Sequence, residues 1–155
     1  MKKDGLFWIA ILRIIVGAMF LTTWLNNVFE GLYTPEGLLS FFTTDFPQAG
    51  NPLEFYAGFI NHFILPIRTV FAPFQFVTEF LLGAALIAGF LTPLASLAGI
   101  FFLLNTFLAT FGHDWPWAYF LPISILAVTF LARAGRRFGL DAILLRRFGE
   151  KGILY

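Results

Sequence analysis

The chain alternates long apolar stretches with shorter polar ones. A helix that crosses about 30 Å of hydrocarbon needs about 20 mostly apolar residues. Four stretches are long enough, at about 6–28, 68–90, 93–112 and 115–134. Pro93 separates the second from the third as a tight hairpin, because the residue before a proline disfavours the helical conformation. We therefore expect an all-α protein, an integral membrane four-helix bundle in which residues 1–155 form a single membrane domain.

Short helices are expected outside these spans. In the loop 30–67, Thr34-Pro35 and Asn51-Pro52 each place a capping side chain before a proline, which is typical of a helix start. The second of these helices, about 52–64, is amphipathic but too short to span. It should lie on the outer membrane surface or cover the bundle. The tail 135–155 contains GLDAILLRRFG, which predicts an amphipathic helix in the cytoplasmic interface.

The composition agrees with a membrane protein and excludes several classes of function. Of the 155 residues, 59% are hydrophobic and 12% are charged, and the mean hydropathy is +0.81. The chain has no cysteine, which excludes disulfide exchange, iron–sulfur clusters and thiolate-bound zinc. A net charge of +1 without a basic stripe argues against nucleic acid as a partner. Two histidines without ligand spacing predict no metal site, and we expect no tightly bound cofactor.

The basic residues predict the orientation. Lys2 and Lys3 precede the first span, and six more Lys and Arg residues follow the fourth. The loops between carry mainly acidic side chains. Because basic residues are enriched on the cytoplasmic side, we expect both termini in the cytoplasm and a multi-pass protein of a prokaryotic cell (inner) membrane. The first apolar run resembles a signal peptide, but Arg13 interrupts it and no cleavage site follows, so we interpret it as an anchor.

Four charged or amide side chains lie well inside the predicted spans, away from the span ends: Arg13, Gln75, Glu79 and Asn105. A charge near the bilayer centre costs about 2.5–3.5 kcal/mol or more, so such charges normally pair with each other. Counted from the inner ends of their spans, Arg13 and Glu79 lie at comparable depth, and we expect them to pair, with Asn105 as a third partner. Such a cluster can hold the helices together. Alternatively, Glu79 handles protons or binds a quinone.

A second group of polar and aromatic residues is expected at the outer surface. Its members are Trp24, His62, His113, Asp114 and Trp115. A histidine exchanges protons near neutral pH, and a His–Asp neighbour beside aromatic rings suits the headgroup of a quinone. The alternative is that the tryptophans form an interfacial belt.

Three segments together resemble the DoxX family of small four-helix membrane proteins. They are RIIVGAMF in the first span, TEFLLGAALIAGFLTPLASLAG across the hairpin, and AGRRFGLDAIL after the fourth span. The family includes the DoxD-like small subunit of thiosulfate:quinone oxidoreductase. Family members often carry a glycine and then a lysine near the outer end of the first span, where this chain has Trp24 and Asn27. The resemblance implies an accessory membrane subunit, linked in some members to electron transfer to quinone, and implies no catalytic residue.

Two functions remain open from the sequence. The first is a subunit of a quinone-linked oxidoreductase or respiratory electron-transfer complex, for example of the thiosulfate:quinone type, with quinone as its ligand. The second is a non-catalytic structural or assembly subunit of a larger membrane complex. A small transporter with Arg13 and Glu79 along its path is a third and would require oligomerisation. The expected partners are membrane lipid and either other subunits or further copies of the chain.

Overall fold

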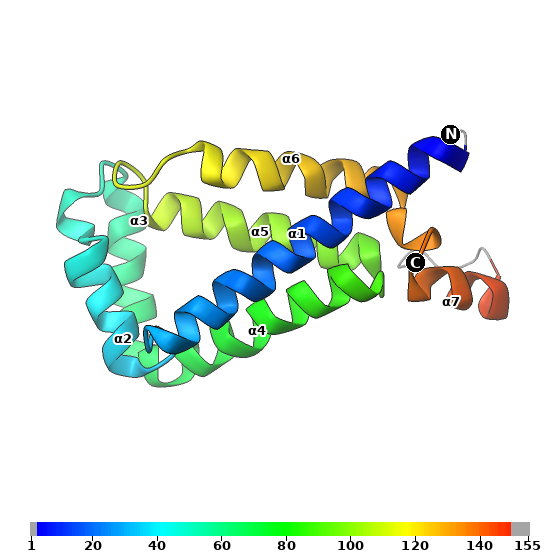
Figure 1. Ribbon diagram of the computed structural model, residues 1–155. Helices are drawn as coiled ribbons and strands as arrows, with labels where there is room; N and C mark the ends of the chain where they lie inside the picture. Colours follow the sequence, from blue (N-terminus) through cyan, green and yellow to red (C-terminus); the bar gives the residue numbers. More distant parts are fainter. Residues whose placement is uncertain (1–2, 150–155) are drawn as a thin grey trace.

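The computed structural model describes residues 3–149, and none of them lies in a β-strand. Four long helices pack into a bundle in which α1 contacts α4 and α6, and α5 contacts the same two helices (Figure 1). These helices are α1 (Lys3–Phe29), α4 (Arg68–Ala88), α5 (Thr92–Ala109) and α6 (Trp117–Ala132). The all-α bundle predicted from the apolar stretches is confirmed.

Length and composition allow three helical segments to cross a membrane: Gly5–Phe29, Glu54–Ala88 and Thr92–Ala109. The fourth apolar helix, α6, has 16 residues, or roughly 24 Å at 1.5 Å per residue. Its crossing therefore stays a prediction.

The turn between α4 and α5 is as tight as Gly89 and Pro93 predict. Gly89 ends α4 with φ of 60°, and Leu91 precedes α5 with φ of 46°. Both values lie in the left-handed region, which glycine adopts readily and leucine rarely does. Pro93 occupies the first turn of α5, where its missing N–H has no helical partner to lose.

Residues 30–67 form a cap across one end of the bundle (Figure 1). The cap consists of α2 (Pro35–Ser40), η1 (Phe41–Asp45), η2 (Gln48–Gly50), α3 (Glu54–Phe59), η3 (Ile60–Ile64) and η4 (Leu65–Ile67). Thr34 caps α2 as predicted, accepting a hydrogen bond from the backbone N–H of Gly37 at 3.0 Å. The expected cap at Asn51 is wrong, because α3 begins later, at Glu54.

Asn51 instead joins the cap to the bundle. Its side-chain amide donates to the carbonyls of Leu108 and Ala109 at 3.0 and 3.2 Å, and Gln48 donates to the same Ala109 carbonyl at 2.9 Å. The last carbonyls of a helix have no intrahelical partner. The cap therefore supplies hydrogen-bond donors for the last carbonyl groups of α5.

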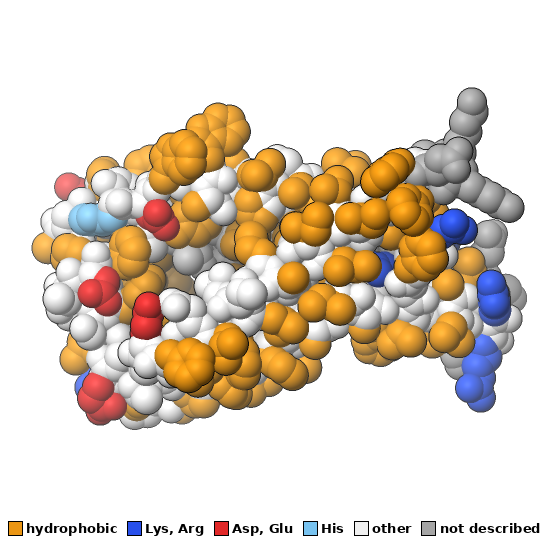
Figure 2. Space-filling model, in the orientation of Figure 1, with side chains coloured by type: hydrophobic (Ala, Val, Ile, Leu, Met, Phe, Trp, Pro, Cys, Tyr) orange, Lys and Arg blue, Asp and Glu red, His pale blue; other side chains and the backbone are white. Residues whose placement is uncertain are grey.

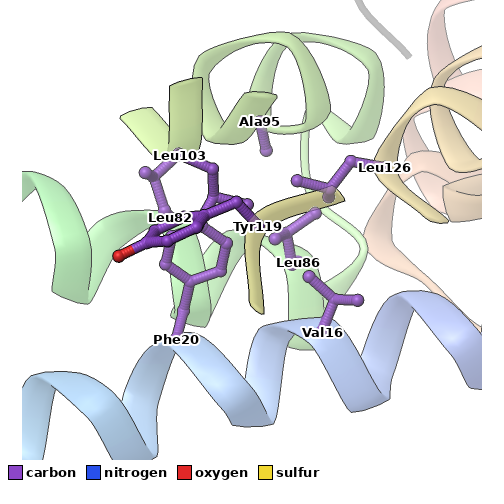
Figure 3. Close-up of a cluster of buried hydrophobic side chains, with 8 residues drawn as sticks. All are labelled: Val16, Phe20, Leu82, Leu86, Ala95, Leu103, Tyr119 and Leu126. Atoms are coloured by element: carbon purple, nitrogen blue, oxygen red, sulfur yellow. The ribbon is translucent and has the colours of Figure 1, made fainter. Parts of the chain in front are cut away.

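The centre of the bundle is a cluster of eight buried side chains (Figure 3). They are Val16, Phe20, Leu82, Leu86, Ala95, Leu103, Tyr119 and Leu126. Helices α1 and α4 approach closely at Gly17 and Gly83, since a Cβ added at Gly17 would lie 2.9 Å from the backbone nitrogen of Ile87. Small residues at such crossings are typical of membrane helices.

Charged side chains gather at the two ends of the molecule, and apolar side chains cover the middle (Figure 2). Most acidic residues lie on the cap, whereas most arginines lie at the opposite end, where α1 begins and where α7 (Leu140–Phe148) packs. The tail was predicted as residues 135–155, of which 150–155 lie outside the described residues. Its amphipathic helix is present as α7.

Candidate functional site

The most unusual polar side chain of the bundle is Glu79, which is only 2% exposed on α4. Its carboxyl group accepts a hydrogen bond from the Tyr33 hydroxyl at 2.6 Å. The Asn27 amide lies 3.5 Å from the same oxygen and donates to Tyr33 at 3.2 Å. Glu79, Tyr33 and Asn27, hereafter the Glu79 site, join α4, the first cap turn and the end of α1.

The local fold of the α1–α2 turn places Tyr33 there. Gly31, with φ of 73°, lets the chain reverse at the end of α1, and the N–H of Leu32 donates back to the Asn27 carbonyl at 3.0 Å. The Tyr33 ring then packs edge-on against Phe76 of α4, with the ring centroids 5.3 Å apart.

Trp24 belongs to this neighbourhood rather than to the predicted surface group. Its ring lies 5.1 Å from those of Phe76 and Phe80, and its indole N–H donates to the Phe76 carbonyl at 3.1 Å. These two phenylalanines flank Glu79 along α4. Trp24 therefore packs on α4 next to the Glu79 site.

An open, mainly apolar groove of about 320 Å³ runs beside the site. Its lining comes from the end of α1, the α1–α2 turn and α4: Val28, Gly31, Tyr33, Thr34, Pro73, Phe76 and Val77. Tyr33 is common to the groove and to the Glu79 site. An apolar molecule in the groove would thus reach a phenol that is hydrogen-bonded to a buried carboxyl group.

The electrostatics of the site differ from those of an ion pair. Among the described residues, Glu79 binds two neutral donors and no cation. Burial, and then the hydrogen bond to Glu79, raise the pKa of Tyr33 above its ordinary value, so the phenol remains a donor. Because neither partner is charged, Glu79 can gain or lose a proton without breaking an ion pair.

The predicted pair of Arg13 with Glu79 is wrong. Arg13 is fully buried, and its guanidinium donates to the carbonyls of Ala134 and Phe138 at 3.0 and 2.9 Å. It contacts Gly89 at the α4–α5 turn, which is ten residues, or roughly 15 Å, from Glu79 along α4. Counting depth from the inner end of each span failed because helical side chains tilt toward the N-terminus of their own helix. On these antiparallel helices the tilt carries the Arg13 side chain toward the inner end and the Glu79 side chain away from it.

The charge balancing Arg13 comes from Asp141. The Asp141 carboxylate accepts hydrogen bonds from the backbone N–H groups of Leu91 and Thr92 at 2.7 and 2.8 Å, and its own N–H donates to the Gly89 carbonyl at 2.9 Å. The AGRRFGLD segment therefore joins α1, the α4–α5 turn and the end of α6. We call these contacts the Arg13–Asp141 network.

The other two members of the predicted intramembrane cluster are also elsewhere. Asn105 on α5 accepts from the Tyr56 hydroxyl of the cap at 2.7 Å and donates to the Phe101 carbonyl at 2.7 Å. Gln75 is half-buried on α4 and takes no part in the hydrogen bonds of Glu79. The predicted three-helix polar cluster is therefore not formed. Glu79 and Asn105 bind residues of the cap, and Arg13 binds the segment that follows α6.

The predicted surface group is not assembled either. His62 is exposed, and its Nδ1 lies 2.8 Å from the Gly58 carbonyl of its own helix. His113 packs against Phe46 at 6.4 Å, and Asp114 accepts from the Tyr119 hydroxyl at 2.6 Å. Within residues 3–149, no hydrogen bond, ion pair or ring contact joins His62 to His113 or Asp114, and no group of three acidic or histidine side chains could hold a metal. Trp115 is exposed, as a belt residue would be.

Residues 8–113 match the family model of DoxX. This chain belongs to the DoxX family. No curated protein and no solved structure matches it. The family and the apolar helices together make the chain an integral membrane protein.

In this DoxX protein, the matched region contains the whole Glu79 site. At the two positions where the chain departs from the usual pattern of the resemblance, Asn27 lies 3.5 Å from the Glu79 carboxyl group, and Trp24 packs against Phe76 and Phe80, which flank Glu79 on α4. The departures thus concern the surroundings of one carboxyl group.

Sequence reasoning did not identify Tyr33 as a site residue and did not place Asn27 next to Glu79. A usable signal was present, because the chain has 22 phenylalanines and only four tyrosines. The three described tyrosines, Tyr33, Tyr56 and Tyr119, donate to Glu79, Asn105 and Asp114, respectively. Where phenylalanine is the default aromatic residue, each tyrosine marks a hydroxyl with a partner.

Proposed function

We propose that this DoxX protein is a membrane subunit of a quinone-linked electron-transfer complex and that it binds quinone in the groove beside the Glu79 site. The observation that carries the proposal is the buried Glu79 carboxyl group, hydrogen-bonded to a tyrosine that also lines an apolar groove. We therefore propose this groove as the quinone site in place of the histidine group predicted from the sequence, because the groove combines apolar surface with one hydroxyl group.

The residues fit the chemistry of this ligand class. A quinone has an apolar tail and ring with carbonyl oxygens, and its reduction takes up electrons and protons. Val28, Phe76 and Val77 offer apolar contacts. The Tyr33 hydroxyl has one proton, which it donates to Glu79 at 2.6 Å. When Glu79 is protonated and donates to the Tyr33 oxygen instead, Tyr33 can pass its own proton to a reduced quinone oxygen and take the proton of Glu79, which is left as a carboxylate. Since the chain has no cysteine for a cluster, the electrons would come from a partner subunit.

Filling the groove tests the proposal. Val77→Trp places a bulky ring in the groove, and Val128→Trp is the matched control, because Val77 and Val128 are similarly exposed but Val128 lies on α6. We expect Val77→Trp to lower the quinone bound per protein at least tenfold in nanodiscs containing ubiquinone or menaquinone, and Val128→Trp to leave it unchanged. Equal binding by both variants and the wild type would reject the groove. The resemblance makes thiosulfate the first electron donor to assay in the assembled complex.

A second candidate is a non-catalytic structural or assembly subunit, or a homo-oligomer. It is favoured by the exposed phenylalanines of the cap, Phe55 and Phe63, which lie on a segment fixed to α5 by Asn51. Aromatic residues of this kind are enriched where subunits meet. This candidate predicts no change in quinone content for Val77→Trp and loss of partner proteins for Phe55→Ser with Phe63→Ser.

The proposed location is a prokaryotic cell membrane with both termini in the cytoplasm. The separation of acidic and basic ends supports it (Figure 2). Because the chain has no cysteine, single cysteines at Ser40 and Tyr155 report orientation by labelling in intact cells. We expect an impermeant maleimide to label Ser40→Cys only. Labelling of both positions from outside would overturn this topology.

A further inference from the structure

We infer that the arginine-bearing end of the molecule, residues 133–147, binds the headgroups of anionic phospholipids. This inference does not depend on quinone. The segment contains Arg133, Arg136, Arg137, Arg146 and Arg147 immediately after α6. Its one acidic residue, Asp141, is buried against the α4–α5 turn and offers no surface charge. Basic side chains gather at this end (Figure 2), and within residues 133–147 no acidic side chain is exposed.

Apolar side chains accompany these arginines on the same surface. Phe138 is 60% exposed, and Leu140 and Ile143 of α7 are 44% and 59% exposed. Leu140, Ile143 and Arg147 have the spacing of one helical face, and Arg146 follows Ile143 by three residues. An exposed stripe that is apolar in its first turn and basic in its last suits the boundary between acyl chains and headgroups.

The level of this stripe relative to the membrane follows from α1. Phe138 packs edge-on against Phe7 of α1, with the ring centroids 5.6 Å apart, and Phe7 in turn contacts the exposed Trp8. Phe138, two residues before the stripe begins, thus connects it to the exposed apolar side of α1. The arginines lie where that apolar surface ends, which is the level of the phosphate groups.

Anionic phospholipid fits this surface better than an acidic protein does. A guanidinium group can bind a phosphate through two parallel hydrogen bonds. The exposed Ile143 and Phe138 add contacts for acyl chains, and their continuity with the spanning surface places them in lipid. Each basic side chain near an anionic membrane surface contributes about 1 kcal/mol, or about fivefold in affinity.

Lipid binding by the full chain in detergent tests the inference. Dioleoyl-phosphatidylglycerol and dioleoyl-phosphatidylcholine are titrated separately, and bound lipids are counted by native mass spectrometry. We expect the wild type to prefer phosphatidylglycerol, and Arg146→Gln with Arg147→Gln to reduce that preference about 25-fold. Arg146→Lys with Arg147→Lys should keep most of it. Arg68→Gln, at the cap end, is the control and should keep all of it.

Three results of the lipid titrations would overturn the inference: equal affinity of the wild type for the two lipids, an unchanged preference in the double Gln variant, or an equal loss in Arg68→Gln. Equal affinity would instead favour an acidic protein as the partner of this surface. Competition with excess inorganic phosphate distinguishes a lipid site from a simple anion site. If acyl-chain contacts at Ile143 and Phe138 contribute to binding, phosphate should not displace the lipid. Complete displacement by phosphate would therefore also contradict the lipid assignment.

Discussion

A double-mutant cycle between Arg13 and Glu79 separates the observed arrangement from a direct ion pair. In the structure, Arg13 binds backbone carbonyls at one end of the bundle, and Glu79 binds Tyr33 near the other. Their positions differ by roughly 15 Å along α4. Sites more than about 7–10 Å apart with no shared partner add within about 0.5 kcal/mol. The two charges should therefore act independently.

The single losses follow from the partners that remain. Arg13→Leu leaves three carbonyl acceptors without their donor and leaves the charge of the buried Asp141 uncompensated, so we expect a loss of about 3–5 kcal/mol in the free energy of unfolding. Glu79→Leu leaves the Tyr33 hydroxyl without its acceptor, which costs about 1–3 kcal/mol. The Arg13→Leu/Glu79→Leu variant should lose the sum of the two.

The assay is reversible unfolding in mixed micelles, followed by circular dichroism. A positive control is the cycle of Tyr33→Phe with Glu79→Gln, whose side chains are 2.6 Å apart and should be coupled by about 0.5–3 kcal/mol. Recovery of stability in the Arg13→Leu/Glu79→Leu variant by more than about 1 kcal/mol would refute the assignment, because only a shared interaction produces it.

Further predictions concern single contacts. Gly135→Ala should destabilise by about 1–3 kcal/mol, because its Cβ would overlap Thr92 and Asp141, whereas Gly58→Ala, with open space around it, should be neutral or gain up to about 1 kcal/mol in the same unfolding assay. Folding raises the pKa of Tyr33 above its ordinary value of 10.0. The neutral Tyr33 therefore stabilises the fold fully below pH 10.0, and this contribution to the free energy of unfolding is lost as the pH rises above that value. Tyr33→Phe should accordingly make the melting temperature fall less steeply at alkaline pH. Asn51→Ala should cost about 1–3 kcal/mol and increase hydrogen exchange in the cap, and unchanged exchange would contradict its role in fixing the cap.

The elements of the fold could be predicted because they depend on local patterns. The length of the apolar stretches predicted the four long helices, and Pro93 after Gly89 predicted the hairpin between α4 and α5. Thr34 before Pro35 gave the start of α2. Each of these signals lies within a few residues of the feature that it predicts, so no knowledge of packing was needed.

The candidate site could not be predicted because it depends on contacts between distant segments. Glu79 was visible as a charge inside an apolar stretch, but Tyr33, 46 residues away, lies in a polar connection whose path over the bundle no periodicity fixes. The partner of Arg13 was hidden for a related reason, since Asp141 follows it by more than 100 residues and acts through the backbone of Thr92. Depth along a helix also says little about which way a long side chain extends.

Photo-crosslinking with an azido-quinone tests the central claim most directly, because it locates the bound ligand. The wild type in nanodiscs is labelled, digested and sequenced by mass spectrometry, with excess unmodified quinone as competitor. The proposal predicts competed labels on residues 28–34 and 73–77, the two walls of the groove beside Glu79, and their loss in Val77→Trp. Competed labels at His113 and Asp114 instead, or none that competitor removes, would contradict it.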